Sequence, residues 1–345
     1  MTRSSLYASA RHWLAPLVPL YQFGLTLREL QLRSGLKPIR RLRWPVVSIG
    51  NLSTGGSGKT PLTITLAKAL TARGLLVDVL SRGHGRRSAL STLVDPMGTA
   101  EEFGDEPLLI ARETGVPVFV ATERYQAGLL AEKASRQVIE SASEQVRVHL
   151  LDDGFQHRQL ARDIDILLLS RTDLNGHLLP AGNLREPLRA IQRAAVIAIP
   201  ADEAALETEV KSRGSQATVW RLHRRMELPR VDGPVAAFCG IAQPEQFFQG
   251  LESAGLRVVS RISFADHHRY TARDLNRLAA EARQAGAKAL FTTEKDRVRL
   301  GPLAATLPES IPLRIAQLCI KIENEDAVID WLIARLESSR PEPCQ

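Results

Sequence analysis

Short apolar runs alternate with segments of helical periodicity along most of the chain, and this alternation predicts an α/β fold. The first such unit has an apolar strand at 44–49, a helix in which Leu62, Leu66 and Leu70 recur at helical spacing, and a second apolar strand at 75–80. Because a crossover helix connects parallel strands, we expect a mostly parallel sheet. Further strands are predicted at residues 116–120, 146–153, 164–169, 195–199, 218–222, 235–239, 256–262 and 289–292.

Composition divides the chain into three predicted segments. Proline, glycine and charge become denser between Glu227 and Pro234, which is typical of a linker. Beyond it, a smaller C-terminal α/β lobe is expected, with a terminal helix from about Asn324. The predicted segments are a basic apolar segment at residues 1–43, a sheet-containing core at 44–228, and the linker with the C-terminal lobe at 229–345.

The net charge is concentrated at the N-terminus. The 345 residues carry a formal charge of +7, and residues 1–43 alone hold eight Lys and Arg against one acid, Glu29. These eight are Arg3, Arg11, Arg28, Arg33, Lys37, Arg40, Arg41 and Arg43. The rest of the chain is therefore neutral, which argues against a nucleic-acid partner, because such a binder needs a basic surface on its folded body.

The same segment is apolar between residues 14 and 27, with Trp13, Tyr21 and Phe23. It is shorter than the roughly 20 apolar residues that cross a bilayer, and two prolines interrupt it. Leucine and aromatic side chains beside arginines are typical of a helix that lies in a membrane interface. A helix packed on the protein's own core, with a solvated basic flank, is the alternative.

A glycine-rich run at 48–62 reads S-I-G-N-L-S-T-G-G-S-G-K-T-P-L and lies between the first strand and the first helix. Gly55, Gly56 and Gly58 allow backbone N–H groups to converge on an anion. Lys59 adds a cation for the β- and γ-phosphates of a nucleotide. This strand, loop and helix predict a phosphate-binding loop, or P-loop.

The run departs from the usual G-x-x-x-x-G-K-[ST] pattern at Ser53, which stands where the first glycine belongs, but its G-G-x-G-K-T core is complete. Thr60 offers a hydroxyl to Mg²⁺, and Pro61 fits the first turn of a helix. The residues predicted to bind the nucleotide are Thr54, Gly55, Gly56, Ser57, Gly58, Lys59, Thr60 and Pro61.

Two carboxylates, Asp152 and Asp153, end the apolar strand at 146–153. Such a pair beside a P-loop is the Walker-B arrangement for Mg²⁺, and adjacent ionised carboxylates are costly without a cation. A helix cap or turn acid is the alternative. The polar run that follows, Gly154 to Arg158 with His157, continues the same sheet edge.

The residues by themselves do not decide the role of three other titratable groups. Asp105 and Glu106 precede a short helical pattern, and on charge alone they complement a helix dipole. His267 lies in a run dense in titratable groups, and an isolated histidine is more often structural than catalytic.

Two arginines are further candidates for this edge. Arg124 begins a long predicted helix, where it can bind an anion. Arg185 is followed by Glu186, and by themselves the two residues would be interpreted as a surface ion pair.

Seven motifs in this order resemble the tetraacyldisaccharide 4′-kinases, the lipid A 4′-kinases of Gram-negative bacteria. They are S-I-G-N-L-S-T-G-G-S-G-K-T-P, S-R-G-H-G-R, G-D-E-P, L-D-D-G-F-Q-H, G-N-L-R-E-P, A-D-H-H-R-Y and T-E-K-D. The resemblance covers nearly the whole chain. His84 departs from it, because a tyrosine is expected there, whereas Ser53 fits the family's form of the loop.

The resemblance implies a P-loop NTPase-like kinase that uses ATP and Mg²⁺. It would transfer the γ-phosphate to the 4′-hydroxyl of a tetraacylated glucosamine disaccharide 1-phosphate in lipid A biosynthesis. It would be a peripheral, monotopic enzyme at the cytoplasmic face of the inner membrane, with no nucleic-acid or protein partner. The alternative is a membrane-associated P-loop ATPase switch, which would not need the acid–base groups of G-D-E and D-H-H.

The resemblance also implies residue roles. Asp105 would be the general base, paired with His267 from the C-terminal lobe, so that lobe closure would complete the pair. Thr60, Asp152 and Asp153 would bind the metal or its second shell, with Glu106 as a possible contributor. The substrate headgroup would meet Arg124, Arg185, Glu186 and His157.

Overall fold

The computed structural model describes residues 12–138 and 145–338. Residue contacts divide the chain into two compact units, which are taken separately below. Unit 1 consists of Met1–Ser81, Glu123–His223 and Lys321–Gln345, and unit 2 of Arg82–Thr122 and Arg224–Ile320. The three segments predicted from composition stay a prediction.

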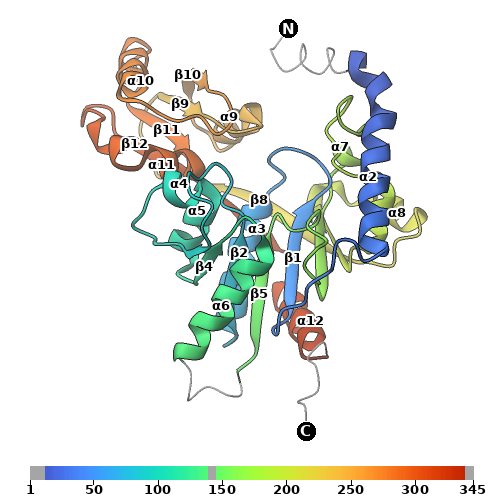
Figure 1. Cartoon of the computed structure of the whole chain (residues 1–345). Coiled ribbons are helices and arrows are strands. Elements are labelled where there is room, and N and C mark those ends of the chain that lie inside the picture. The colour runs from blue at the N-terminus through green and yellow to red at the C-terminus, as the bar shows by residue number, and fades with distance from the viewer. Residues whose placement is uncertain (1–11, 139–144, 339–345) are drawn as a thin grey trace. The chain divides into compact units, whose positions relative to one another are not determined.

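Unit 1 is built on a parallel sheet whose strands follow the order β8-β7-β6-β1-β5-β2. Of these strands, β1, β2, β5 and β8 are labelled in Figure 1. The strands are β1 (Val46–Asn51), β2 (Leu76–Ser81), β5 (Arg147–Asp152), β6 (Ile164–Leu168), β7 (Val196–Pro200) and β8 (Thr218–Glu227). The central strands β1 and β6 are buried along their whole length, which is typical of parallel strands covered on both faces. In the β1–β5 register Ile49 lies beside Asp152, so the carboxyl ends of these strands meet at one edge.

Helix α3 (Lys59–Ala72) follows β1 and contacts β1, β2 and β5. Its Leu62, Leu66 and Leu70 are fully buried, which confirms the helical spacing predicted from the sequence. The other helices of unit 1 are η1 (His12–Leu17), α2 (Val18–Arg33), α6 (Arg124–Val138), α7 (Arg171–Leu174), η2 (Leu188–Arg193), η3 (Ala201–Glu203), α8 (Ala205–Ser212) and α12 (Glu325–Ser338).

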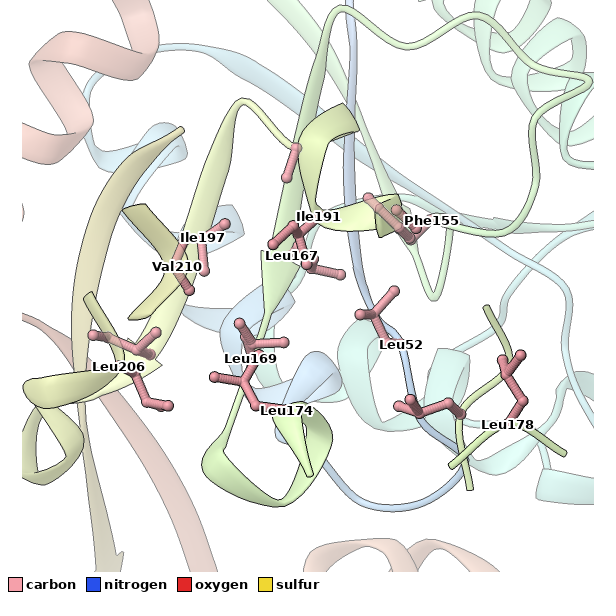
Figure 2. Packing of buried hydrophobic residues seen from close by; sticks show 14 residues of the cluster. Leu52, Phe155, Leu167, Leu169, Leu174, Leu178, Ile191, Ile197, Leu206 and Val210 are labelled. Atoms are coloured by element: carbon pink, nitrogen blue, oxygen red, sulfur yellow. The ribbon is translucent and has the colours of Figure 1, made fainter. Parts of the chain in front are cut away.

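An apolar cluster includes the residues that follow β1 and β5, Leu52 and Phe155 (Figure 2). Leu52 follows β1 and Phe155 follows β5, and both side chains are fully buried in this cluster with Leu167 of β6. Val18 and Tyr21 of α2 pack against it. The packing fixes the start of each loop, and therefore the polar residues that come next.

Unit 2 contains a second parallel sheet, in the order β10-β9-β11-β12, and an antiparallel pair, β3 with β4. Its strands are β3 (Thr92–Leu93), β4 (Val118–Val120), β9 (Val235–Cys239), β10 (Val258–Ser263), β11 (Ala289–Thr293) and β12 (Leu313–Ile322). Its helices are α4 (Ala100–Phe103), α5 (Asp105–Thr114), α9 (Pro244–Ser253), α10 (Ala272–Gln284), α11 (Glu294–Leu300) and η4 (Gly301–Thr306). The prediction of an α/β fold with mostly parallel strands is confirmed.

Candidate active site

The P-loop connects β1 to α3 through two glycines with positive φ. Gly55 has φ 119° and Gly58, the N-cap of α3, has φ 93°. Both values favour glycine. The Thr54 N–H donates to the Asn183 carbonyl at 2.8 Å, which fixes the loop from outside. The first turn of α3 therefore starts directly at this loop. The backbone N–H groups of a first helical turn have no partner within the helix, which is the arrangement that binds phosphate.

Lys59 lies above the carboxyl end of β1. Its Nζ donates to the Asn51 Oδ1 at 3.1 Å and lies 3.7 Å from the Asp153 Oδ1. Thr60, the next residue of α3, is buried. The predicted cation thus lies at the same strand edge as the predicted carboxylates.

Asp152 and Asp153 have different surroundings. Asp152 is buried, and its Oδ1 accepts a hydrogen bond from the Thr63 Oγ1 at 3.2 Å. Asp153 has φ 49° and accepts two hydrogen bonds from the Arg185 guanidinium, at 2.9 and 3.1 Å. Burial raises the pKa of Asp153, but Lys59 and Arg185 outweigh burial and hold that pKa below its usual range. Asp153 is therefore a carboxylate at neutral pH.

The two arginines expected at this edge both contact Asp153. Arg185 binds its carboxylate, and the Arg124 Nη2 donates to its carbonyl oxygen at 3.3 Å. Glu186 is buried and pairs with Arg193 at 2.7 Å. The interpretation of Arg185 and Glu186 as a surface ion pair is therefore wrong, because successive side chains leave the loop in different directions.

His157 lies in the loop that follows β5, where its N–H donates to the Gly154 carbonyl at 2.8 Å. The Arg162 Nη1 donates to the His157 carbonyl at 2.8 Å, and the Arg162 Nη2 donates to Asp165 at 3.0 Å. Asp165 is on β6, so this chain of contacts ties the loop to the sheet.

Asp105 begins α5 in unit 2 and is 4% exposed. Its Oδ2 lies 3.1 Å from the His267 Nδ1. Gly104, which precedes it, has φ 91°, and an added Cβ would lie 3.0 Å from the backbone of Gly83. Asp105 and His267 both belong to unit 2, so their contact does not require closure of one unit on the other.

The charges around this pair favour a carboxylate. Burial raises the pKa of Asp105, but the hydrogen bond with His267 and the charge of Arg299 outweigh burial and lower that pKa. The hydrogen bond with Asp105 in turn raises the pKa of His267. The His84 ring lies edge-on to His267, with centroids 5.3 Å apart. Asp105 also lies in the first turn of a helix, so the predicted dipole role is compatible with the contact.

Glu106 also belongs to unit 2, where Lys295 of α11 pairs with it at 2.5 Å. Lys295 lies in the T-E-K-D motif, to which the sequence assigned no role. A further contact that the sequence did not predict is made by Arg299, whose guanidinium binds Asp105. Its only sequence signal is a position one helical turn after Asp296 of the same motif.

The described part of the chain contains no helix that is long and apolar enough to cross a membrane.

A P-loop at the end of a parallel strand, with two carboxylates at the end of the neighbouring strand, defines a P-loop nucleotide-binding enzyme. Comparison with known proteins identifies the family within this class. A family model described as tetraacyldisaccharide-1-P 4′-kinase, LpxK, matches residues 10–337. The chain belongs to the tetraacyldisaccharide 4′-kinase family.

Relatives and a solved structure agree with this assignment. A tetraacyldisaccharide 4′-kinase of Koribacter versatilis is 41% identical over 332 residues, which cover 93% of this chain and 98% of that protein. The tetraacyldisaccharide 4′-kinase of Geobacter metallireducens is 37% identical, over an alignment that covers 85% of this chain and 90% of that protein. The crystal structure of LpxK from Aquifex aeolicus in complex with ATP has a TM-score of 0.72 and 32% identity, covering 95% of this chain and 99% of that chain.

Proposed function

We propose that this member of the family transfers the γ-phosphate of ATP to the 4′-hydroxyl of a tetraacylated glucosamine disaccharide 1-phosphate, with the residues described above. The observation that carries the proposal is the meeting of Lys59, Asp152 and Asp153 at the carboxyl ends of β1 and β5. Phosphoryl transfer depends mainly on positioning and charge neutralisation. Backbone N–H groups of the P-loop and the Lys59 ammonium supply part of that neutralisation.

The donor atoms at this edge fit Mg²⁺. The Thr60 hydroxyl and the carboxylates of Asp152 and Asp153 are hard oxygen donors. The described residues contain no group of three or more His, Cys, Asp or Glu that could hold a metal by themselves. This fits Mg²⁺, which takes one or two carboxylates and completes its shell with water and phosphate. When bound, the ion neutralises charge on the β- and γ-phosphates. Glu106 stays a proposed contributor, although Lys295 pairs with it here.

The acid–base group of the proposal is the Asp105–His267 pair. A kinase needs a group that accepts the proton of the attacking alcohol, whereas a hydrolytic switch has no sugar hydroxyl to deprotonate. A carboxylate hydrogen-bonded to an imidazole at 3.1 Å is suited to this purpose. We assign Arg124, Arg185, Glu186 and His157 to the substrate headgroup, where a guanidinium can bind the 1-phosphate in a bidentate manner.

The membrane proposal rests on the two apolar faces of α2. Val18 and Tyr21 pack against the unit 1 core, whereas Leu20 and Phe23 are 69% and 66% exposed. The outward apolar set of η1 and α2 is Trp13, Leu14, Leu17, Leu20, Phe23, Leu27 and Leu30. A helix that only covered its own core would not carry this second face. We propose that it lies in the cytoplasmic interface of the inner membrane, beside a lipid substrate.

The same helix contacts the proposed headgroup loops. The Tyr21 hydroxyl donates to the Arg185 carbonyl at 2.8 Å. Two turns further along, Arg28 donates to the Gln156 carbonyl and Glu29 pairs with Arg158. The helix therefore contacts both loops that carry the proposed headgroup residues.

Lipid phosphorylation tests the function directly. The purified protein is incubated with labelled ATP and tetraacyldisaccharide 1-phosphate, and we expect a phosphorylated lipid. ATP hydrolysis without lipid phosphorylation would support the ATPase switch instead. Replacing Asp105 by Ala should lower kcat on the order of 10²-fold or more while leaving the KM for ATP unchanged. Asp232→Ala, at an exposed acid of the same unit, is the matched control.

Sedimentation with anionic lipid vesicles tests the interface helix. Phe23→Glu with Leu27→Glu should release the protein from vesicles, because charge on the outward face opposes burial in lipid. Leu90→Glu, at a residue of unit 2 that is 75% exposed, is the control. Unchanged sedimentation of the helix variant would contradict the interfacial proposal.

A further inference from the structure

Arg299 of α11 is a buried guanidinium that lies between two carboxylates. It is 6% exposed at its side chain. Its Nε and Nη2 donate to the Asp105 Oδ2 at 2.8 and 2.5 Å, and its Nη1 donates to the Asp296 Oδ1 at 3.1 Å. The Nη1 also donates to the Gly240 carbonyl at 2.5 Å. One side chain therefore joins the start of α5 to the end of β9 and to α11, all within unit 2.

The second carboxylate, Asp296, is a fixed point. It is fully buried, and it accepts the Gly240 N–H at 3.1 Å, the Tyr270 hydroxyl at 2.8 Å and the Thr293 hydroxyl at 2.6 Å. A buried carboxylate with this many donors has little freedom to move. Because Arg299 is bound to Asp296, the position of its guanidinium beside Asp105 is fixed as well.

These contacts occupy Asp105 on both oxygens. Oδ2 receives Arg299 and faces the His267 Nδ1, while Oδ1 accepts the Glu106 N–H at 3.0 Å. His267, by contrast, is 38% exposed at its side chain, and its Nε2 lies 3.9 Å from the Asp266 Oδ2. Asp105 is therefore held on both oxygens, whereas its imidazole partner is partly exposed.

We infer that Arg299 is a positioning residue for the phosphoryl transfer: it binds Asp105 and the buried Asp296 together, and so holds the Asp105 carboxylate in place beside His267. The inference rests on the proposed role of the Asp105–His267 pair. The Asp105 Oδ2 lies 3.1 Å from the His267 Nδ1, so a shift of the carboxylate would break this contact. The Arg299 Nη2, 3.3 Å from Nδ1, also opposes a positive charge on the ring.

The step balances in protons and electron pairs. The 4′-hydroxyl oxygen forms a bond to the γ-phosphorus while its proton passes to the Asp105–His267 pair. The bond from that phosphorus to the bridging oxygen of ADP breaks, and ADP leaves with the electron pair. The pair then releases the proton to solvent.

Arg299→Lys is the informative variant, because it keeps a positive charge between two buried carboxylates but cannot bind both as a planar guanidinium does. We expect kcat for lipid phosphorylation to fall on the order of 10²-fold, because small displacements of an acid–base group have effects of this size. The KM for ATP should stay within about twofold, since the P-loop belongs to unit 1. Arg297→Lys is the matched control, because Arg297 is on the same helix and donates to the Gly301 carbonyl at 3.2 Å.

A double-mutant cycle with Asp105→Asn separates positioning from folding. Activities are corrected for the active fraction, taken from the amplitude of a single turnover. If Arg299 acts through Asp105, Arg299→Lys lowers kcat in the natural background and has little further effect beside Asp105→Asn. An equal fold-loss in both backgrounds, or a kcat for Arg299→Lys within about twofold of the natural enzyme, overturns the inference. If Asp105→Asn alone leaves kcat unchanged, the role proposed for the Asp105–His267 pair is what fails.

Discussion

A buried histidine should make unit 1 less stable as the pH rises. His149 lies within β5, fully buried, with its Nδ1 2.6 Å from the Asp78 Oδ1 and its Nε2 3.6 Å from the Glu132 Oε1. Burial opposes the charge on the ring, but the two carboxylates outweigh it and raise the pKa of His149 to about 9. The Glu132 Oε1 also accepts the N–H of Arg43 at 2.6 Å, so the cluster fixes the segment that leads into β1.

The magnitude follows from the difference between folded and unfolded states. The ordinary pKa is 6.5 and the folded value is about 9. At about 1.4 kcal/mol per pH unit, this difference amounts to about 3 kcal/mol of unfolding free energy. Because the folded state binds the proton more tightly, the contribution is fully present below pH 6.5 and is lost as the pH rises through 9.

Urea unfolding at several pH values between 6.5 and 9 measures this term. His149→Gln stays neutral throughout, so its destabilisation should be about 3 kcal/mol at the acid end and should shrink towards the alkaline end. His177→Gln, at an exposed histidine of the same unit, should keep the slope of the natural protein. Two results would refute the reasoning. One is that the unfolding free energies of His149→Gln and of the natural protein change in parallel with pH. The other is that the His149 imidazole titrates near pH 6.5 by NMR.

Three further substitutions probe the two units. Lys59→Met should lower kcat/KM for ATP on the order of 10²-fold or more, measured by steady-state kinetics, because it removes the ammonium from the P-loop. Gly104→Ala should cost about 1–3 kcal/mol in thermal or urea unfolding and lower kcat, because its φ of 91° and the 3.0 Å approach to Gly83 exclude a Cβ. Arg193→Gln should raise the KM for the lipid on the order of tenfold and leave the KM for ATP unchanged, because it unpairs the buried Glu186.

Each of these has an outcome that would count against it. Natural kcat/KM in Lys59→Met would contradict the P-loop assignment. An unchanged unfolding midpoint in Gly104→Ala would show that the backbone relaxes there. An equal rise in both KM values for Arg193→Gln would mean that Arg193 supports the fold of unit 1 rather than the headgroup loop.

The sequence predicted those parts of the site that depend on local order. The P-loop was recognisable because Gly55, Gly58 and Lys59 act at fixed spacing between one strand and one helix. Asp152 was recognisable because a parallel strand brings its carboxyl end to the same edge as its neighbour's.

Other parts depend on contacts between distant segments, which no local pattern encodes. Arg299 binds Asp105 across a separation of 194 residues. The contact exists because residues 82–122 fold with the C-terminal part of the chain in unit 2. Strand β12 was not predicted because it is largely half-buried or exposed, and its polar residues interrupt the alternation that marks a strand. Arg193 was missed because η2 is too short to show a periodicity.

The outward apolar face of α2 has a kinetic consequence. With that face seated in an interface, the enzyme would remain on the surface between turnovers, and its lipid substrate would arrive by lateral diffusion. The rate would then follow the mole fraction of substrate in the lipid surface rather than its bulk concentration. Adding inert phospholipid at constant substrate would slow the reaction by surface dilution. Because Tyr21 bonds to the Arg185 carbonyl, the depth at which the helix lies would also set the height of the headgroup loop above the bilayer.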